Sequence, residues 1–266
     1  MNFVKIFGCV VCMGVFSFAM PKTGLADPQQ NEASLQKMIE KTLREHPEIV
    51  LDILRSNSEA VLDIAQQGSD VRRKRNLEIQ WREDMKTKKE VRLAGRPVFG
   101  PPDAKVRIVA FTDFTCHYCE LASKTVDTIL DRYGNNVNLT VKILPLDEKG
   151  PGGKAALYFV ALAQQNQDAA RLFYKKMFAA REQLLAEGEE FVKKTVKEIG
   201  VDMKKLTRDA RSRKILDIMR EDQDDAQKLG VEGTPHFLVN NLVVRGALPL
   251  EMFSVAVDMA LKRGSD

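Results

Sequence analysis

An apolar run that leads directly into a pair of cysteines stands near the middle of the chain: Val106-Arg107-Ile108-Val109-Ala110-Phe111-Thr112-Asp113-Phe114-Thr115-Cys116-His117-Tyr118-Cys119. Its first six residues are mostly apolar, which is typical of a buried strand. A helix is predicted from Cys116 to about Tyr133, where Gly134 ends it. Residues 137–144 then alternate like a second strand. Strand, helix and strand with a CxxC motif at the start of the helix are the context expected of a redox-active thiol pair.

The composition restricts the class of protein. The chain has 266 residues, of which 44% are hydrophobic and 29% are charged, with a formal net charge of +4 and four cysteines. This balance suits a globular protein and excludes a disordered chain, a collagen-like repeat and a multispanning membrane protein. Four cysteines are also too few for a disulfide-dense scaffold.

Residues 1–26 are typical of a secretory signal peptide. An uncharged apolar stretch covers residues 6–20, and Gly24-Leu25-Ala26 supplies small residues for cleavage. Cleavage removes Cys9 and Cys12, so the exported chain keeps only the CxxC pair. We therefore expect an exported protein; retention of this segment as a single membrane anchor is the alternative.

The spacing of the two remaining cysteines favours redox exchange over a structural role. A disulfide across two residues closes almost no loop, and a structural zinc site needs two further ligands. At a helix N-terminus, Cys116 meets unpaired N–H groups and the positive end of the helix dipole, which both favour the thiolate. Cys119 lies one turn deeper on the same face. We expect His117 and Tyr118, which stand between them, to tune the redox potential.

The residues before this core are predicted to be helical. Apolar residues recur at helical spacing, and His46-Pro47 separates one helix from the next. Gly68 is expected to divide these helices from a charged helix over residues 70–92. That charged helix is interpreted as a solvated face, because its acidic residues are interleaved with the basic ones, which argues against nucleic-acid binding. The first helices are too short to bury their own apolar stripes. They are therefore assigned to oligomerisation, with packing onto the following domain as the alternative.

The second half combines helices with a strand pair. Helical periodicity is predicted over residues 155–165, 169–181, 189–199, 203–210 and 214–229. Gly233-Thr234-Pro235 closes this block, and the two short runs 236–239 and 242–245 form a predicted hairpin. A last helix begins near Pro249. We expect Thr234-Pro235 to lie beside the CxxC motif, where a cis bond would let Thr234 offer its backbone to an extended substrate segment.

The segment from Phe111 to Cys119, the helical insertion and Gly233-Thr234-Pro235 ahead of a strand pair resemble the DsbA family of periplasmic thiol–disulfide oxidoreductases. The resemblance covers residues 97–263 and implies an α/β thioredoxin fold with an inserted helical domain at about 151–230. It also implies Cys116 as the nucleophile, Cys119 as the resolving thiol and Pro235 as the cis-proline. Upstream, residues 46–54 resemble the N-terminal oligomerisation segment of ScsC-like members.

Together, the residue patterns and the resemblance predict three regions: a signal peptide over residues 1–26, a helical oligomerisation region over 27–92 and a DsbA-like thioredoxin domain over 97–266. The chain departs from the family pattern at Ala110, where family members keep a buried acidic residue. Lys142 and Asp113 are candidates to move the proton of Cys119 instead. Thr234 replaces the valine typical of oxidases and resembles isomerase-type members, and His236 is also unusual.

These features predict a periplasmic thiol–disulfide oxidoreductase that isomerises or oxidises disulfides, with isomerisation slightly favoured. Its expected partners are unfolded or wrongly disulfide-bonded exported proteins, a membrane redox partner that recycles the CxxC pair, and one or two further copies of the chain. No nucleic acid, cofactor or bound metal is expected. The alternatives are a copper-tolerance protein in which both cysteines, His117 and His236 surround one cation, and a chaperone that holds unfolded clients.

Overall fold

The structure is a computed structural model that describes residues 28–263, so the predicted signal peptide, with Cys9 and Cys12, lies outside the described residues. The chain divides into two units, one that ends at Gly68 and one that begins at Ser69. None of the helices in the described part has an apolar stretch long enough to cross a membrane.

The first unit consists of helices whose apolar side chains stay exposed. It contains α1 (Pro28–Glu45), α2 (Pro47–Ser56) and the first residues of α3 (Ser58–Asp84). The break between α1 and α2 is the predicted one, since Pro47 lacks the N–H that a continuous helix needs. Among the described residues, none of those in α2 is buried.

The predicted helix break at Gly68 is wrong. α3 runs without interruption through this residue, and a Cβ atom built there would meet nothing within 4 Å. One glycine in a helix interior lowers helix stability by only about 1 kcal/mol relative to alanine. This loss does not interrupt α3, which has 27 residues.

The second unit is built on a five-stranded sheet with the order β1-β3-β2-β4-β5. Its central strands β2 (Val106–Thr112) and β3 (Val137–Ile143) are parallel, and β4 (His236–Val239) and β5 (Leu242–Arg245) continue the sheet antiparallel to β2. These four strands are the predicted ones. A short edge strand, β1 (Val98–Phe99), pairs antiparallel with β3 and was not expected.

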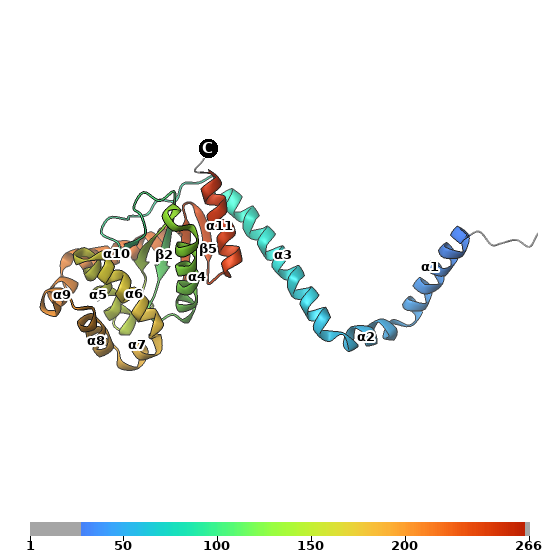
Figure 1. Ribbon diagram of the computed structural model, residues 1–266, viewed down its shortest axis with the longest axis horizontal. Coiled ribbons are helices and arrows are strands. Elements are labelled where there is room, and N and C mark those ends of the chain that lie inside the picture. Colours follow the sequence, from blue (N-terminus) through green and yellow to red (C-terminus); the bar gives the residue numbers. More distant parts are fainter. Residues whose placement is uncertain (1–27, 264–266) are drawn as a thin grey trace, which may run out of the picture. The chain divides into compact units, whose positions relative to one another are not determined.

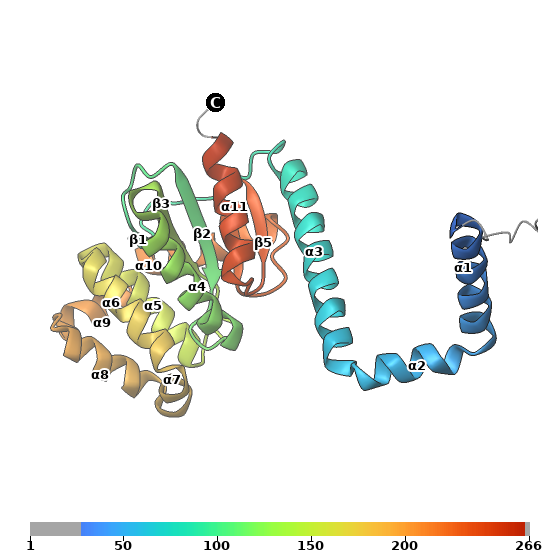
Figure 2. The same ribbon diagram turned by 45° about the vertical axis from the view of Figure 1, so that its right-hand side comes forward.

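Helices cover both faces of this sheet (Figures 1 and 2). α4 (His117–Tyr133) and α11 (Leu250–Arg263) pack on one face, in the same apolar cluster as Ala110. α10 (Arg213–Lys228) covers the other face, where Phe111 and Leu238 pack against Ala226. Because neighbouring residues of a strand point to opposite faces, Ala110 and Phe111 belong to different clusters.

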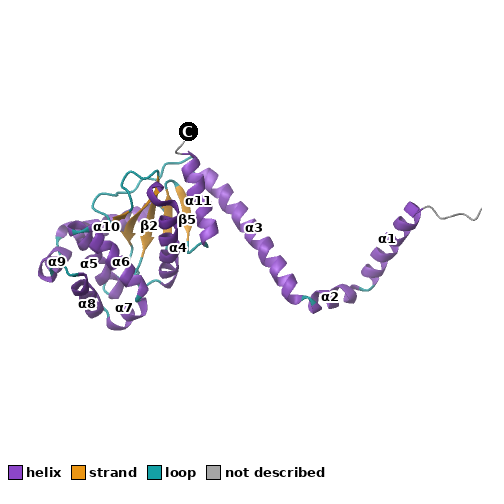
Figure 3. Cartoon of the chain, in the orientation of Figure 1, coloured by secondary structure: helices purple, strands orange, loops and turns teal. Residues whose placement is uncertain are grey.

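The predicted helical insertion lies between β3 and β4 in the chain, and its helices are among those drawn in purple in Figure 3. It comprises α5 (Pro151–Gln165), α6 (Gln167–Ala179), α7 (Arg181–Glu187), α8 (Glu189–Ile199), α9 (Met203–Ala210) and α10. α7 was not expected: Ala180, at φ −123° and ψ 38°, leaves the helical conformation, so α6 ends earlier than predicted and a separate helix follows.

The charged segment after Gly68 is not a wholly solvated helix. The helix ends at Asp84, and Trp81 near its end is 1% exposed. The Trp81 Nε1–H donates to the carbonyl of Val243 at 2.7 Å, and the Val243 N–H donates to Asp84 Oδ2 at 3.0 Å. The end of α3 therefore satisfies backbone groups of the edge strand β5, which would otherwise be free.

Candidate active site

Cys116 stands at the junction of β2 and α4. It is the N-cap residue of α4 with an extended backbone, φ −77° and ψ 122°, and its side chain is half-buried. Cys119 lies in the first turn of α4 and is 1% exposed. Both thiols are free. The predicted arrangement of one accessible and one buried thiol is what the structure has.

The surroundings shift the pKa values of the two thiols in opposite directions. Hydrogen bonding from the Cys119 thiol, then from Thr234 and the backbone N–H groups of Cys119 and Tyr118, lowers the pKa of Cys116 to about 5 despite its partial burial. Burial raises the pKa of Cys119 far above its usual value. At neutral pH the pair is therefore one thiolate and one thiol, the combination that a nucleophile and a resolving group require.

The segment before β4 faces Cys116. The β2–β4 register places Phe111 opposite His236, which brings Thr234-Pro235 to the CxxC motif. The Thr234–Pro235 peptide bond is cis, and Cys116 in its protonated form donates to the carbonyl of Thr234 at 3.4 Å. The Thr234 side chain also lowers the pKa of both cysteines, although its buried hydroxyl makes no hydrogen bond of regular geometry.

The two residues inside the motif point outward. The side chain of His117 is 59% exposed and places Nδ1 3.9 Å from Glu120 Oε2, while Tyr118 is 62% exposed. Their rings lie 5.7 Å apart, and Leu121, on the next turn, is 41% exposed. These side chains offer an accessible apolar surface next to Cys116.

The side chains proposed to replace the missing acid are bound to partners other than Cys119. Lys142 pairs in register with Phe111 on the α10 face, where its Nζ lies 2.5 Å from Asp222 Oδ1 and 3.0 Å from Asp225 Oδ2. The carboxylate of Asp113 accepts from other backbone groups, and only its backbone acts on Cys119.

Sequence reasoning missed a hydroxyl beside the buried thiol. The side chain of Thr112, the last residue of β2, is buried and hydrogen-bonds Cys119, which acts to lower its pKa. The alternation along β2 places Thr112 on the same face as Ala110, so the signal was present in the strand prediction.

The residues of the proposed copper site do not meet. His236 is 4% exposed and packs edge-to-face against Phe111, with ring centroids 6.2 Å apart, whereas Cys119 belongs to the opposite face. Burial, followed by the nearby Arg245, lowers the pKa of His236 to about 4. Within residues 28–263 no three His, Cys, Asp or Glu side chains form a group that could hold a metal ion.

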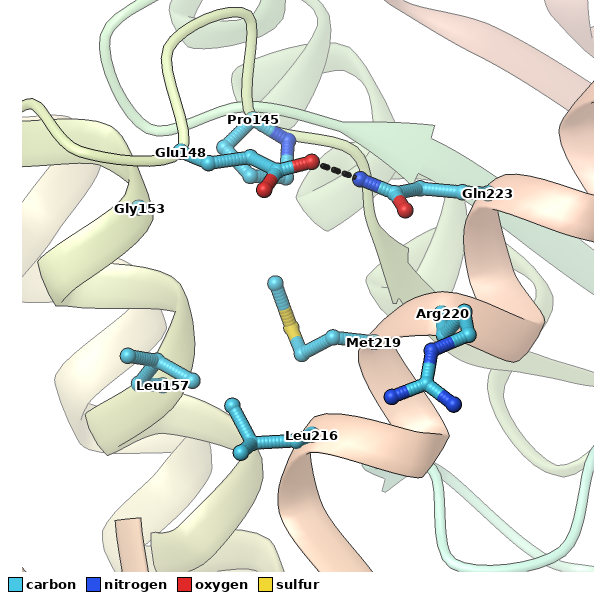
Figure 4. Close-up of a pocket in the computed structure, with 8 residues that line it drawn as sticks. All are labelled: Pro145, Glu148, Gly153, Leu157, Leu216, Met219, Arg220 and Gln223. Atoms are coloured by element: carbon cyan, nitrogen blue, oxygen red, sulfur yellow. Dashed lines mark hydrogen bonds between the residues drawn. The ribbon is translucent and has the colours of Figure 1, made fainter. Parts of the chain in front are cut away.

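A cavity of about 260 Å³ lies between α10, the start of α5 and the loop after β3 (Figure 4). Met219 points into it above Leu157 and Leu216, and Glu148 and Gln223 are joined by a hydrogen bond across its rim. Its lining residues include neither cysteine nor the Thr234-Pro235 segment, so the cavity is separate from the candidate active site.

A parallel β-α-β unit with CxxC at the start of its helix, facing a cis-proline ahead of an antiparallel strand pair, defines a thioredoxin-fold protein of the thiol–disulfide oxidoreductase class. The family model described as thioredoxin matches residues 93–259. The chain belongs to this family and, within it, to the DsbA-like thiol–disulfide oxidoreductases. The predicted family and fold class are confirmed.

Individual relatives agree with this assignment. The chain is 29% identical over 186 residues to a probable disulfide bond formation protein D of Bacillus anthracis, covering 62% of this chain and 77% of that one. The crystal structure of a thioredoxin-like oxidoreductase from Silicibacter pomeroyi is 30% identical with a TM-score of 0.53, covering 64% of this chain and 94% of that one. The crystal structure of Proteus mirabilis ScsC in a transitional conformation is 20% identical to this chain with a TM-score of 0.55. The match covers 90% of this chain and 98% of that one, and it shows a similarity of fold.

Other relatives are much longer proteins. A Na(+)/H(+) antiporter NhaA 1 of Mycobacterium sp. (strain KMS) is 27% identical over 146 residues, and the chain spans 23% of its length.

Proposed function

We propose that Cys116 and Cys119 are the redox pair through which this oxidoreductase exchanges disulfides with client proteins. The observation that carries the proposal is the opposite titration of the two thiols, one half-buried with a pKa of about 5 and one buried with a raised pKa. An accessible thiolate next to a protonated, sheltered thiol suits a two-step exchange.

In the first step the Cys116 thiolate attacks one sulfur of a client disulfide. A bond forms between Cys116 and that sulfur, the client disulfide breaks, and the other client sulfur leaves as a thiolate. In isomerisation a different client thiolate then attacks the mixed disulfide and restores the Cys116 thiolate, with no net oxidation. If the client does not rearrange, Cys119 loses its proton and attacks the Cys116 sulfur. The client leaves with both sulfurs reduced, and the CxxC pair is oxidised.

The groups around Cys116 suit a polypeptide client. The carbonyl of Thr234 lies 3.4 Å from the sulfur, where a client strand can pair with the backbone in place of the thiol. Tyr118 and Leu121 supply exposed apolar surface for side chains beside the client cysteine. Unfolded chains expose both kinds of group, so wrongly disulfide-bonded proteins fit this site.

Isomerisation is the favoured exchange, because it needs a protein that can hold one client while its disulfides rearrange. The exposed apolar residues of α1 and α2 fit self-association of the chain, as a dimer or trimer that presents more than one Cys116 to the same client. We place this work in the periplasm, after removal of residues 1–26.

Oxidation is the second candidate, and the low pKa of Cys116 supports it. A stable thiolate favours the reduced form of the pair, which makes the disulfide form a stronger oxidant. In this role the client thiolate attacks the oxidised pair, and a membrane redox partner must remove the electrons that the pair gains.

Reactivation of scrambled ribonuclease tests the proposal. The reduced protein should restore ribonuclease activity, Cys116→Ser should not, and Cys119→Ser should accumulate mixed disulfides with the client that are visible on a non-reducing gel. Equilibration of the CxxC pair with glutathione gives the redox potential, which separates an isomerase from an oxidase. Reactivation by the Cys116→Ser protein at the wild-type rate would refute the assignment of the pair.

A further inference from the structure

Arg181 reaches from the helical insertion to the residue that precedes Cys116. It is the first residue of α7, and its Nε–H donates to the carbonyl oxygen of Thr115 at 2.8 Å. Its side chain is 15% exposed, although the neighbouring Glu182, with which it forms an ion pair, is 83% exposed. The guanidinium of Arg181 is therefore largely buried, and it hydrogen-bonds the backbone next to Cys116.

The peptide group held in this way is the one that carries Cys116. Its oxygen, the carbonyl of Thr115, accepts from Arg181, and its N–H, that of Cys116, donates to the carbonyl of Asp113 at 3.2 Å. A peptide group is planar, so hydrogen bonds at both ends fix the orientation of the plane. The Cα atom of Cys116 lies in this plane, so the orientation of the plane sets the point from which the Cys116 side chain departs.

Other contacts also restrain the loop between β2 and α4, to which Thr115 belongs. The Asp113 carboxylate accepts from the N–H and the hydroxyl of Thr115 at 2.9 and 2.8 Å and from the N–H of Leu146 at 3.0 Å. Phe114 is fully buried among the aromatic rings of α5 and α6. Gly152 comes so close that a Cβ there would lie 2.6 Å from Asp113 Oδ1.

Arg181 differs from these restraints in its chemistry. A charge-assisted hydrogen bond is stronger than a neutral one, and the planar guanidinium holds a defined direction that a lysine ammonium does not. The groups that stabilise the Cys116 thiolate include the backbone N–H groups of Tyr118 and Cys119, which follow the same peptide. A small rotation of the Thr115–Cys116 peptide therefore moves the sulfur relative to its donors.

We propose that Arg181 is a positioning residue for disulfide exchange, which aims the Cys116 sulfur by holding the Thr115–Cys116 peptide from the helical insertion. This inference rests on the proposed role of Cys116 as the nucleophile. It assigns to the insertion a part in the reaction, in addition to any contact that it makes with clients.

The test compares reduced Arg181→Met with wild type and with Lys176→Met. Lys176 belongs to the same insertion and binds Glu198 at 3.0 Å on its surface, so its variant controls for loss of a cation there. Thiolate absorbance against pH gives the pKa of Cys116, and reaction with glutathione disulfide gives the exchange rate. In Arg181→Met we expect the thiolate titration to move upward by about one unit and the rate constant to fall roughly tenfold. Lys176→Met should match wild type, and Arg181→Lys should lie between wild type and Arg181→Met.

The outcomes separate this inference from the proposed function. An unchanged titration and rate in Arg181→Met, even with a lower melting temperature, would overturn the positioning role, since a purely structural residue gives that result. Should the methionine variant fail to fold, Arg181→Lys takes its place, and wild-type behaviour in it would overturn the inference equally. If wild type and Cys116→Ser react with glutathione disulfide at the same rate, the proposed function fails as well.

Discussion

At the scale of single residues, identical thiol groups three positions apart acquire opposite properties. Cys116 caps a helix and meets N–H donors and the Cys119 thiol, which lower its pKa to about 5. Cys119 is enclosed by the core, so burial raises its pKa. The hydroxyls of Thr112 and Thr234 act on the buried sulfur of Cys119 and lower its pKa. The chain thus reaches the thiolate–thiol pair without a buried acid at position 110.

The first prediction concerns stability and pH. The pKa of Cys116 falls from 9.0 to about 5 on folding, so the thiolate contributes stability that is fully present above pH 9 and is lost as the pH falls to about 5. The free energy of unfolding of the reduced protein, minus that of Cys116→Ser, should therefore decline from pH 9 to pH 5. Urea unfolding across this window measures it, and a difference independent of pH would contradict the prediction.

A second prediction concerns the residue before the cis-proline. Thr234→Val keeps the shape of the side chain and removes the hydroxyl that lowers the pKa of Cys116, so the thiolate titration should shift upward. Thr128→Val is the matched control, because that hydroxyl lies on the exposed side of α4 and bonds only the carbonyl of Lys124. Equal titration midpoints in the two variants would exclude a role for the Thr234 hydroxyl.

At the scale of elements, a buried ion cluster joins α10 to the sheet. Lys142 of β3 is fully buried between Asp222 and Asp225 of α10, and Arg96 binds the same Asp222 at 2.9 Å. Asp222 Oδ2 also accepts from the N–H of Ile143 at 3.2 Å, which completes the backbone bonding of β3 beyond the short edge strand. The cluster thus fixes α10, the helix that leads to Thr234-Pro235.

The third prediction follows from this cluster. Lys142→Met leaves buried carboxylates short of a partner, and removing one member of a buried pair costs about 3–5 kcal/mol. Lys124→Met, which removes an exposed partner of Glu120 from α4, should cost about 0–1 kcal/mol. Urea unfolding followed by the fluorescence of Trp81 compares the two, and equal losses would refute a stabilising role of the cluster.

Elements also separate what sequence patterns predict from what they miss. The strands and most helices of the insertion follow from local periodicity, and their predicted positions agree with the structure. α7 was missed because the pattern continues through Ala180, whereas the backbone at Ala180 leaves the helical conformation at φ −123° and ψ 38°. Trp81 lies in a run of charges, and only its contact with β5 reveals that this side of α3 is buried.

At the scale of the whole molecule, the apolar side chains of α1 and α2 remain exposed among the described residues. Leu35, Met38 and Ile39 of α1 are 51 to 62% exposed, and Ile53 of α2 is 57% exposed. Burial of such groups supplies about 25 cal/mol per Å² of apolar surface, so leaving them in water favours association.

The fourth prediction tests this association. Ile53→Glu places a charge in the apolar stripe and should convert the oligomer to a monomer in sedimentation experiments, whereas Arg55→Glu, on a side chain that is 73% exposed, should leave the oligomer intact. If oligomerisation serves isomerisation, Ile53→Glu should lose most reactivation of scrambled ribonuclease yet still oxidise a dithiol peptide. A wild-type protein that sediments as a monomer would refute the assignment.

The sequence by itself determined the β-α-β unit, the CxxC motif at its helix start, the strand pair after Thr234-Pro235 and the helical insertion, because periodicity and turn chemistry act between neighbours in the chain. The tertiary structure decided which side chains meet across distant segments. Lys142 pairs with Asp222 and not with Cys119, whereas Thr112 hydrogen-bonds Cys119. His236 packs against Phe111 on the opposite face of the sheet, and Arg181 binds the Thr115 carbonyl. Strand register and helix packing fix these contacts, and no local pattern encodes them.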